Sequence, residues 1–198
     1  MTILTFPSIT PAHVAWGLKS NTESFTSPLN GSTQTIERPG ARWKATLTMP
    51  PLTVSNAVLL DAFLLQLNGK AGRFYLYPHH RPTPRGLGGS GVVSGGGQTG
   101  KTLATTGWTA GWLVLRAGDF FQVGSELKMC TADAVASGTG TVTLQFMPAL
   151  RSAPSNGAAI VSTNPQTIMM LDTDETLTGK APGPSYDPMT LSCIEVFV

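Results

Sequence analysis

The first half of the chain contains one clear alternation of apolar and polar side chains, in the segment RWKATLTM after Gly40 and Ala41. Its apolar set is Trp43, Ala45, Leu47 and Met49. A period of two residues is typical of a strand with one buried face. The segment therefore predicts a half-buried strand, which the proline pair Pro50-Pro51 ends.

The segment TVSNAVLLDAFLLQLNGK has instead the period of an α-helix. Ser55 can cap its start and Asn68-Gly69 can end it, which predicts a helix over residues 56–67. Its stripe at i, i+3, i+4 and i+7 spacing consists of Leu60, Phe63, Leu64 and Leu67. Further apolar residues extend around most of the helix, so we expect burial on more than one side, inside the domain or against a neighbour. The candidate subunit-interface residues are Val58, Ala62 and Leu65.

The remaining segments predict short strands separated by turns. RFYLY is an aromatic strand, and residues 81–100 are dominated by Gly and Pro, which predicts a linker or a long surface loop. WLVLRAGDFFQV, SELKMCTADAV and TVTLQFMP follow as strand segments, the last ended by Pro148, and predict a compact β module of barrel or sandwich type. AAIVS, QTIMMLD and LSCIEVFV each have strand character. The predicted fold class is mainly β with one helix.

Charge changes this picture in one respect. Charged residues make up 12% of the chain, against about 25% in ordinary soluble domains. Such a surface suits a protein partly covered by copies of itself or by neighbours, and it equally suits a neutral Gly/Thr-rich β protein. The net charge of +2 gives no argument for a nucleic-acid partner or a membrane surface.

Targeting and redox signals are also few. No signal peptide is visible at the start, and no apolar run approaches the length that spans a bilayer. We therefore expect a protein folded in a cytoplasm, with no membrane insertion. Cys130 and Cys193 both lie in apolar runs, which predicts buried free thiols and neither a disulfide nor a metal site.

The stretch SGGGQTGKT matches the phosphate-binding pattern G-x-x-x-x-G-K-[ST] at Gly95, Gly100, Lys101 and Thr102. A working phosphate loop follows a buried parallel strand and opens a helix. Here the following LATTGWTAGW is a poor helix former, and no alternating β/α pattern exists to build a parallel sheet. We interpret the match as a consequence of composition and expect no cofactor.

Other residue groups predict no catalytic or metal site. Adjacent His79 and His80 on an extended chain face opposite ways, and the acidic turn LDTDET lacks the glycine and distal carboxylate of a calcium loop. Asp119, Glu126 and Asp133 offer carboxylates, but no pair is singled out. Trp108 and Trp112 flank Gly-rich turns and are candidate contacts for a glycan or a partner.

Four pieces of the sequence occur in a characteristic order over roughly residues 40–152. They are RWKATLTMPPLTVSNAVLLDAFLLQLNGKAGRFYLYPHH, PRG followed by GGGQTGKTLATTGW, LRAGDFFQVG, and TVTLQFMPALRSA. The first contains an L-x-G-x-x-G-x-F turn formed by Leu67, Gly69, Gly72 and Phe74. This order resembles the distal-tail and related tail-tip proteins of long-tailed, non-contractile phages and prophages.

The resemblance implies a β-sandwich core with one helix and an inserted small β-barrel-like module. Residues 1–85 and 153–198 would form the core, and residues 86–152 the Gly-rich linker and the module. It implies a non-enzymatic virion protein, made in the bacterial host and located at the tail tip. Its partners would be itself, in a ring that is commonly a hexamer, together with tail-tube and tip, hub or baseplate proteins. The alternative is a carbohydrate- or host-receptor-binding β module that uses Trp108 or Trp112.

Overall fold

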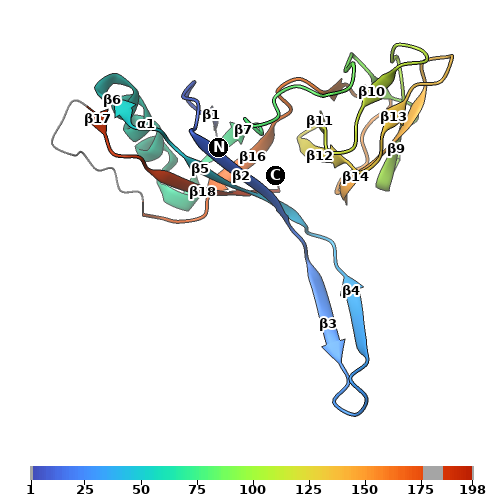
Figure 1. Ribbon diagram of the computed structural model, residues 1–198, viewed down its shortest axis with the longest axis horizontal. Coiled ribbons are helices and arrows are strands. Elements are labelled where there is room, and N and C mark those ends of the chain that lie inside the picture. The colour runs from blue at the N-terminus through green and yellow to red at the C-terminus, as the bar shows by residue number, and fades with distance from the viewer. Residues whose placement is uncertain (1, 176–184, 198) are drawn as a thin grey trace.

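The computed structural model describes residues 2–175 and 185–197 and contains two six-stranded sheets, one α-helix and a projecting two-stranded ribbon (Figure 1). The core sheet has the order β1 (Ile3–Thr5), β7 (Arg73–Leu76), β16 (Thr167–Leu171), β18 (Thr190–Glu195), β5 (Arg42–Thr48), β2 (His13–Lys19). The module sheet has the order β15 (Ile160–Val161), β11 (Phe120–Val123), β12 (Glu126–Cys130), β14 (Val142–Leu150), β9 (Gly100–Thr106), β8 (Val92–Val93). The remaining pairs are β3 (Thr22–Thr26) with β4 (Thr33–Glu37), β10 (Leu113–Leu115) with β13 (Ala134–Val135), and β6 (Leu52–Thr53) with β17 (Ser185–Tyr186).

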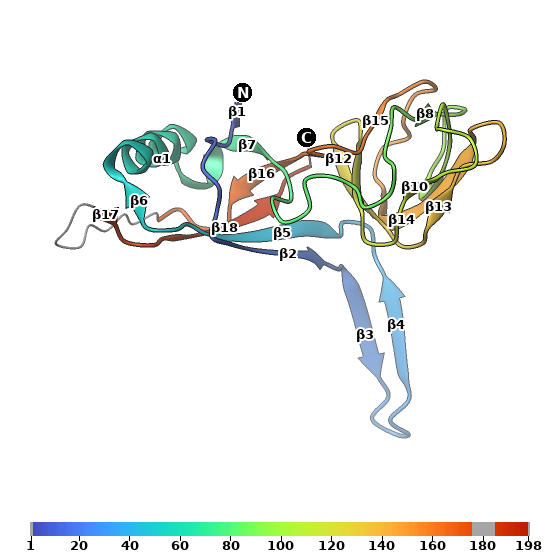
Figure 2. The ribbon, with the colours of Figure 1, turned by 45° about the horizontal axis from the view of Figure 1, so that its top comes forward.

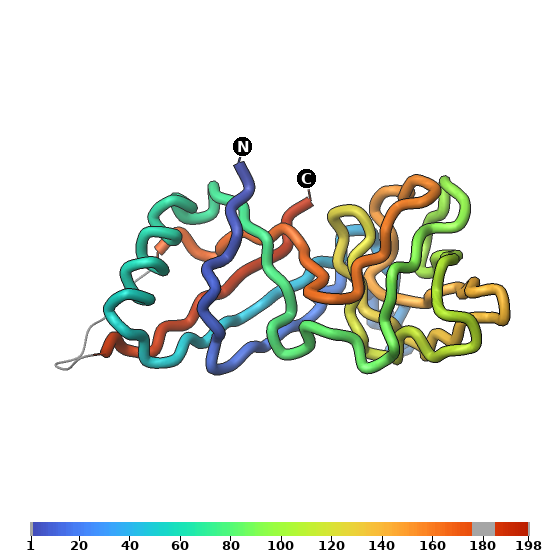
Figure 3. The backbone as a smooth tube through the Cα atoms, turned by 90° about the horizontal axis from the view of Figure 1, so that it is seen from above, coloured from blue at the N-terminus to red at the C-terminus, as the bar shows by residue number. Residues whose placement is uncertain are grey.

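The predicted fold class is confirmed. The structure is mainly β, with 43% strand and 9% helix, a single α-helix within the described residues, and a nearly closed, barrel-like six-stranded sheet. A bridge between Val92 and Ala159 brings the two ends of the module sheet together. The module lies beside the core sheet, and the helix lies at the far end of the molecule (Figures 1 and 3).

The strand β5 lies next to the edge strand β2 of the core sheet, and its predicted pattern is confirmed. It pairs antiparallel with both β2 and β18. All four predicted inward residues are buried: Trp43, Ala45, Leu47 and Met49. A period-two pattern identifies such a strand because successive side chains point to opposite faces.

The helix α1 (Val54–Leu67) begins two residues before the predicted start. Its N-cap is Thr53, whose hydroxyl accepts a hydrogen bond from the Asn56 amide, so Ser55 lies inside the first turn. The predicted end is confirmed, because Asn68 adopts the left-handed conformation typical of a C-cap. The predicted stripe is buried against the core: Leu60, Phe63, Leu64 and Leu67.

The turn after α1 explains the spacing of its two glycines. Gly69 opens the 3₁₀ turn η1 (Gly69–Ala71) with φ of +62°, a conformation that disfavours other residues. A Cβ on Gly72 would lie 2.5 Å from the Leu67 backbone. Both glycines are therefore required for the chain to fold back tightly into β7.

The PRG and AGD motifs, far apart in the sequence, meet at a buried carboxylate. Asp119 accepts hydrogen bonds from the backbone amides of Arg85, Gly86 and Arg116, and pairs with the Arg85 guanidinium at 3.0 Å. Burial by itself raises the pKa of Asp119, but these donors together outweigh it and hold the pKa below its ordinary value. The linker is thereby fixed to the module.

Two strand boundaries in the module differ from prediction. Strand β14 continues past Pro148 to Leu150, because the register with β9 shifts between Gln145 and Leu150, where a residue without an amide hydrogen is tolerated. Strand β15, in the segment expected to complete the core, pairs instead with β11. The module sheet thus extends beyond residue 152 to Val161.

Candidate functional site

The most unusual feature of the fold is the ribbon formed by β3, β4 and the turn between them, residues 22–37, here called the arm. The arm projects away from both sheets (Figures 1 and 2). Every residue of its two strands is exposed, and β3 and β4 pair only with each other among the described strands. An isolated two-stranded ribbon is at best marginally stable in water. The arm is therefore a candidate interaction surface.

The two faces of the arm differ in chemistry. Because residues paired across an antiparallel ribbon share a face, the pairs Phe25–Gln34 and Glu23–Ile36 lie on one face. The opposite face carries five hydroxyl side chains and Glu37: Thr22, Ser24, Thr26, Thr33 and Thr35 supply the hydroxyls. Phe25 is 66% exposed and Ile36 61%, and Leu29 at the tip is 95% exposed. The face that carries Phe25 and Ile36, beside Glu23 and Gln34, is here called the apolar face of the arm, and the opposite one its hydroxyl face.

The base of the arm is a fixed bend in a longer ribbon. Strand β2 leads into β3, and β4 leads into β5, with a kink where the Asn21 side chain donates to the Pro39 carbonyl at 2.7 Å. Glu23 pairs with Arg38 at 2.7 Å, and Glu37 pairs with Lys101 of the module, also at 2.7 Å. These exposed ion pairs add little stability; the direction of the arm follows from its two strands, which continue into β2 and β5 of the core sheet.

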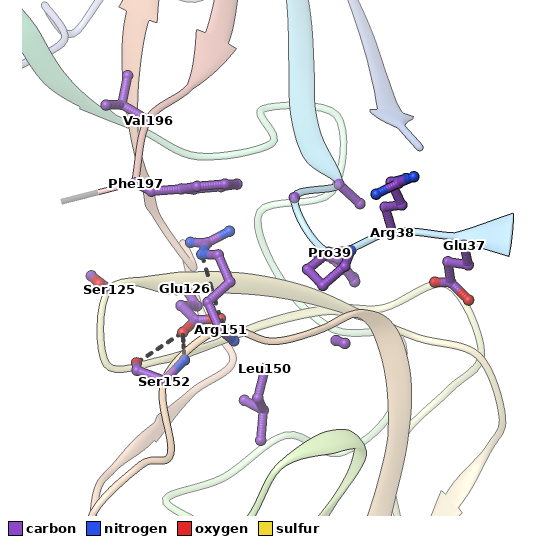
Figure 4. Close-up of a pocket in the computed structure, with 14 residues that line it drawn as sticks. Glu37, Arg38, Pro39, Ser125, Glu126, Leu150, Arg151, Ser152, Val196 and Phe197 are labelled. Carbon is purple, nitrogen blue, oxygen red and sulfur yellow. Dashed lines mark hydrogen bonds and ion pairs between the residues drawn. The ribbon is translucent and has the colours of Figure 1, made fainter. Parts of the chain in front are cut away.

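A pocket of about 660 Å³ lies at this bend, between the base of the arm, the module and the end of the chain; we call it the junction pocket. Figure 4 shows Phe197 and Arg151 facing Pro39 and Arg38 across it. The two arginines already have carboxylate partners, Arg38 with Glu23 and Arg151 with Glu195. The junction pocket therefore offers an apolar cleft with neutralised charges and lacks a ready site for an anion.

Beneath the junction pocket, buried charges connect the core sheet to the module. Arg151 donates to Glu195 Oε1 at 3.1 and 3.0 Å, and Lys128 donates to Glu126 at 2.6 Å. Burial lowers the pKa of Lys128 below its ordinary value. Burial by itself raises the pKa of Glu126, but the hydrogen bond and charge of Lys128 help to hold it below its ordinary value. Every group in this network has a partner, which is typical of a structural junction.

The predicted interface residues lie together on the outer face of α1. Val58, Ala62 and Leu65 are all exposed, at the i, i+4 and i+7 spacing of a single helix face. Val54 and Leu59 are exposed beside them. Within the chain, then, this apolar surface is open; whether a neighbour covers it stays a prediction.

The two predicted contact tryptophans have different positions. Trp108 is 5% exposed, and its Nε1 donates to Thr105 Oγ1 at 2.8 Å. Its ring packs against Gly91, where any side chain would collide with it. The expectation that Trp108 offers a contact surface is therefore corrected: it belongs to the module core. Trp112 is 58% exposed and remains a candidate contact.

The structure also places the phosphate-loop match and the adjacent histidines. Gly100, Lys101 and Thr102 belong to the strand β9. In a phosphate loop, these residues would instead begin a helix. The rings of His79 and His80 diverge, since His79 stacks on Tyr77 and His80 meets the edge of Phe120. Burial lowers the pKa of both histidines.

Among residues 2–175 and 185–197, no group of three His, Cys, Asp or Glu residues is placed to hold a metal ion. No helix in this part of the chain is long and apolar enough to cross a membrane.

Sequence reasoning assigned no element to residues 1–36 and so missed the arm. The usable signal was the Asn30-Gly31 dipeptide between two Thr/Ser-rich segments, a common hairpin turn. Comparison of the chain with protein-family models and with curated proteins found no match.

Proposed function

We propose that this protein is a non-enzymatic structural component of a phage tail tip, similar to distal-tail proteins. In this proposal, copies of the chain assemble into a ring, a hexamer as is common in the family it resembles, that joins the tail tube to tip, hub or baseplate proteins. The order of sequence motifs over residues 40–152 suggests the location in the virion. The mainly β fold with an inserted barrel-like module agrees with what that resemblance implies.

The observation that carries the proposal is the arm. Its apolar face and apolar tip are exposed in the single chain, and a surface of this kind marks an interaction site. A projecting ribbon that meets a different surface on the next copy makes a head-to-tail contact, which closes into a ring when the rotation between copies allows it. The fully satisfied charge network at the junction pocket supports a scaffold role more than a catalytic one.

The test is the mass of the purified chain by light scattering on a sizing column over a range of concentrations, with electron micrographs of any large species. We expect rings from the natural chain. The double variant Phe25→Ser/Ile36→Ser removes the apolar face of the arm and should remain monomeric. Its matched control, Leu87→Ser/Val161→Ser, removes two exposed apolar side chains of the module and should still form rings. A natural chain that is monomeric at every concentration would overturn the proposed self-assembly.

A second candidate function is recognition of a host glycan or receptor by the module. It is favoured by the exposure of Trp112, which immediately precedes β10, and of Val135 on β13, which pairs with Leu113 of β10. Trp112→Ala should then abolish binding to a glycan array while leaving the ring mass unchanged. Absence of any array signal with the natural chain would remove this candidate.

A further inference from the structure

Exposed apolar side chains gather on two elements of the molecule. Of the twelve large apolar residues exposed in the described part of the chain, seven lie on the arm and on α1. On the arm they are Phe25, Leu29 and Ile36; on α1 they are Val54, Val58, Leu59 and Leu65. Exposing either apolar surface to water is unfavourable, and a contact between the two would bury apolar area on both.

The arm cannot cover the helix of its own chain. Figure 1 places α1 and the arm at opposite corners of the molecule, and in Figure 2 the arm again points away from the side of the core sheet that carries α1. The two strands of the arm continue directly into β2 and β5 of the core sheet. An arm–helix contact must therefore join two copies of the chain.

The arm and the outer face of α1 also match in charge and in length. The only charged residue on the apolar face of the arm is Glu23, which already pairs with Arg38, and the only one in α1 is Asp61. Neither surface therefore has to desolvate several charges on contact. Each five-residue strand of the arm is about 17 Å long, and the 14-residue helix is about 21 Å long, so the ribbon can lie along most of the helix.

We propose that the arm of one copy lies along the outer face of α1 in the next copy. Phe25 and Ile36 of the arm contact Val58, Ala62 and Leu65 of the helix, and the hydroxyl face of the arm points to solvent. This contact rests on the proposed function, and it identifies the two surfaces that join neighbours in the ring. Because the surfaces differ, each subunit donates one arm and receives another, as a head-to-tail ring requires.

The size of the contact predicts how assembly depends on concentration. A short ribbon on one helix buries well below the roughly 800 Å² per partner of a standard stable interface. A single arm–helix contact is therefore weak, whereas every subunit in a closed ring makes two. We expect few open dimers and a sharp appearance of rings as concentration rises.

The test is disulfide cross-linking between two single-site variants mixed in equal amounts and oxidised. Phe25→Cys on the arm and Leu65→Cys on α1 should give a covalent heterodimer. The matched control, Thr35→Cys with Leu65→Cys, places the thiol on the opposite face of the arm and should cross-link at least tenfold less. The natural thiols of Cys130 and Cys193 do not compete, because burial raises the pKa of each to about 12.

Three outcomes would overturn the inference. Equal cross-linking by Phe25→Cys and Thr35→Cys would show that the apolar face is not the contact. Preferential cross-linking of Phe25→Cys to itself would indicate a symmetric arm–arm contact. Preferential cross-linking to Leu87→Cys on the module would place the receiving surface elsewhere. If rings nevertheless form in any of these cases, the proposed function stands and only the arm–helix contact fails.

A charge on the receiving surface gives an independent test. Val58→Asp should abolish rings with an unchanged circular dichroism spectrum, since Val58 is exposed and its replacement leaves the fold intact. Asn56→Asp, exposed on the same helix, should leave the ring mass unchanged. Rings formed equally well by Val58→Asp and the natural chain would refute the arm–helix contact, whereas failure of the natural chain itself to form rings would refute the proposed function.

Discussion

Replacing Glu195 with Ala should be among the most destabilising single changes in this protein. Glu195 is fully buried at the end of β18, where Oε1 accepts hydrogen bonds from the Arg151 guanidinium and the Thr167 hydroxyl. Oε2 accepts a hydrogen bond from the Trp43 amide at 3.0 Å. These three donors belong to three different strands or strand ends of the core sheet and the module. Glu195→Ala leaves all of them without their acceptor.

The magnitude follows from the burial of the groups left behind. Removing one partner of a buried ion pair costs about 3–5 kcal/mol, and a buried donor without an acceptor costs about 1–3 kcal/mol. The Arg151 side chain is 22% exposed, so water can replace part of what it loses. We therefore expect a loss of about 4 kcal/mol in the free energy of unfolding. At roughly 2–4 °C per kcal/mol for a chain of this size, Tm falls by about 8–16 °C.

Urea unfolding followed by tryptophan fluorescence measures this loss, at protein concentrations low enough to keep the chain monomeric. Arg151→Ala and the double variant Glu195→Ala/Arg151→Ala complete a cycle. Because the double variant leaves no unpaired charge between these two residues, we expect its loss to be about 2 kcal/mol smaller than the sum of the single losses. Glu23→Ala, which breaks the exposed Glu23–Arg38 pair, is the control and should cost below about 0.5 kcal/mol. A Glu195→Ala loss under about 1 kcal/mol, or strict additivity, would refute the reasoning.

Three further predictions concern the fold. Gly72→Ala should lower the unfolding free energy by about 2 kcal/mol or more, because the added Cβ would collide with the backbone of Leu67. The control is Gly138→Ala, where the added Cβ meets nothing within 4 Å and the unfolding free energy should change by less than about 0.5 kcal/mol. Equal urea midpoints for the two variants would contradict this prediction. Cys130 and Cys193, whose pKa values burial raises to about 12, should react with a thiol reagent at pH 8 only after unfolding; rapid labelling of the native chain would contradict their burial. The pKa of Asp119 is lowered in the folded chain, so its stabilising contribution is present above the unfolded pKa, about 4, and is lost as pH falls through the folded value. Asp119→Asn should therefore cost more stability at pH 7 than at pH 3 in urea titrations, and an equal cost at both would count against that pKa shift.

Short-range pattern alone predicted several regular elements of the core, β5 and α1 among them, but neither β1 nor β2. The alternation around Trp43 and Leu47 and the helical spacing of Leu60 to Leu67 report directly on which side chains face inward. This works because one buried face imposes its own period on the sequence, whatever lies against it. The end of α1 at Asn68 could also be predicted from the local sequence, since the left-handed cap depends on that residue and its neighbours.

The position of an element relative to distant parts of the chain could not be predicted from the local sequence. Trp108 and Trp112 have similar glycine-rich surroundings in sequence, yet one is in the core and the other is exposed, because only Trp108 packs against Gly91. Glu195 and Arg151, 44 residues apart, meet only because the module docks on the core sheet. Nothing in the spacing of these residues encodes that docking.

The same distinction between local and long-range information applies to the candidate assembly surfaces. The sequence by itself determined that α1 is apolar around most of its circumference, and it singled out Val58, Ala62 and Leu65 as interface candidates. Only the tertiary structure decided that these residues face outward, because the core sheet covers one side of the helix and leaves the other open. Likewise, residues 22–37 carry the local turn signal of a hairpin, but its exposure depends on which strands lie beside it. Burial is a property of the whole packed chain, whereas periodicity is a property of its neighbouring residues.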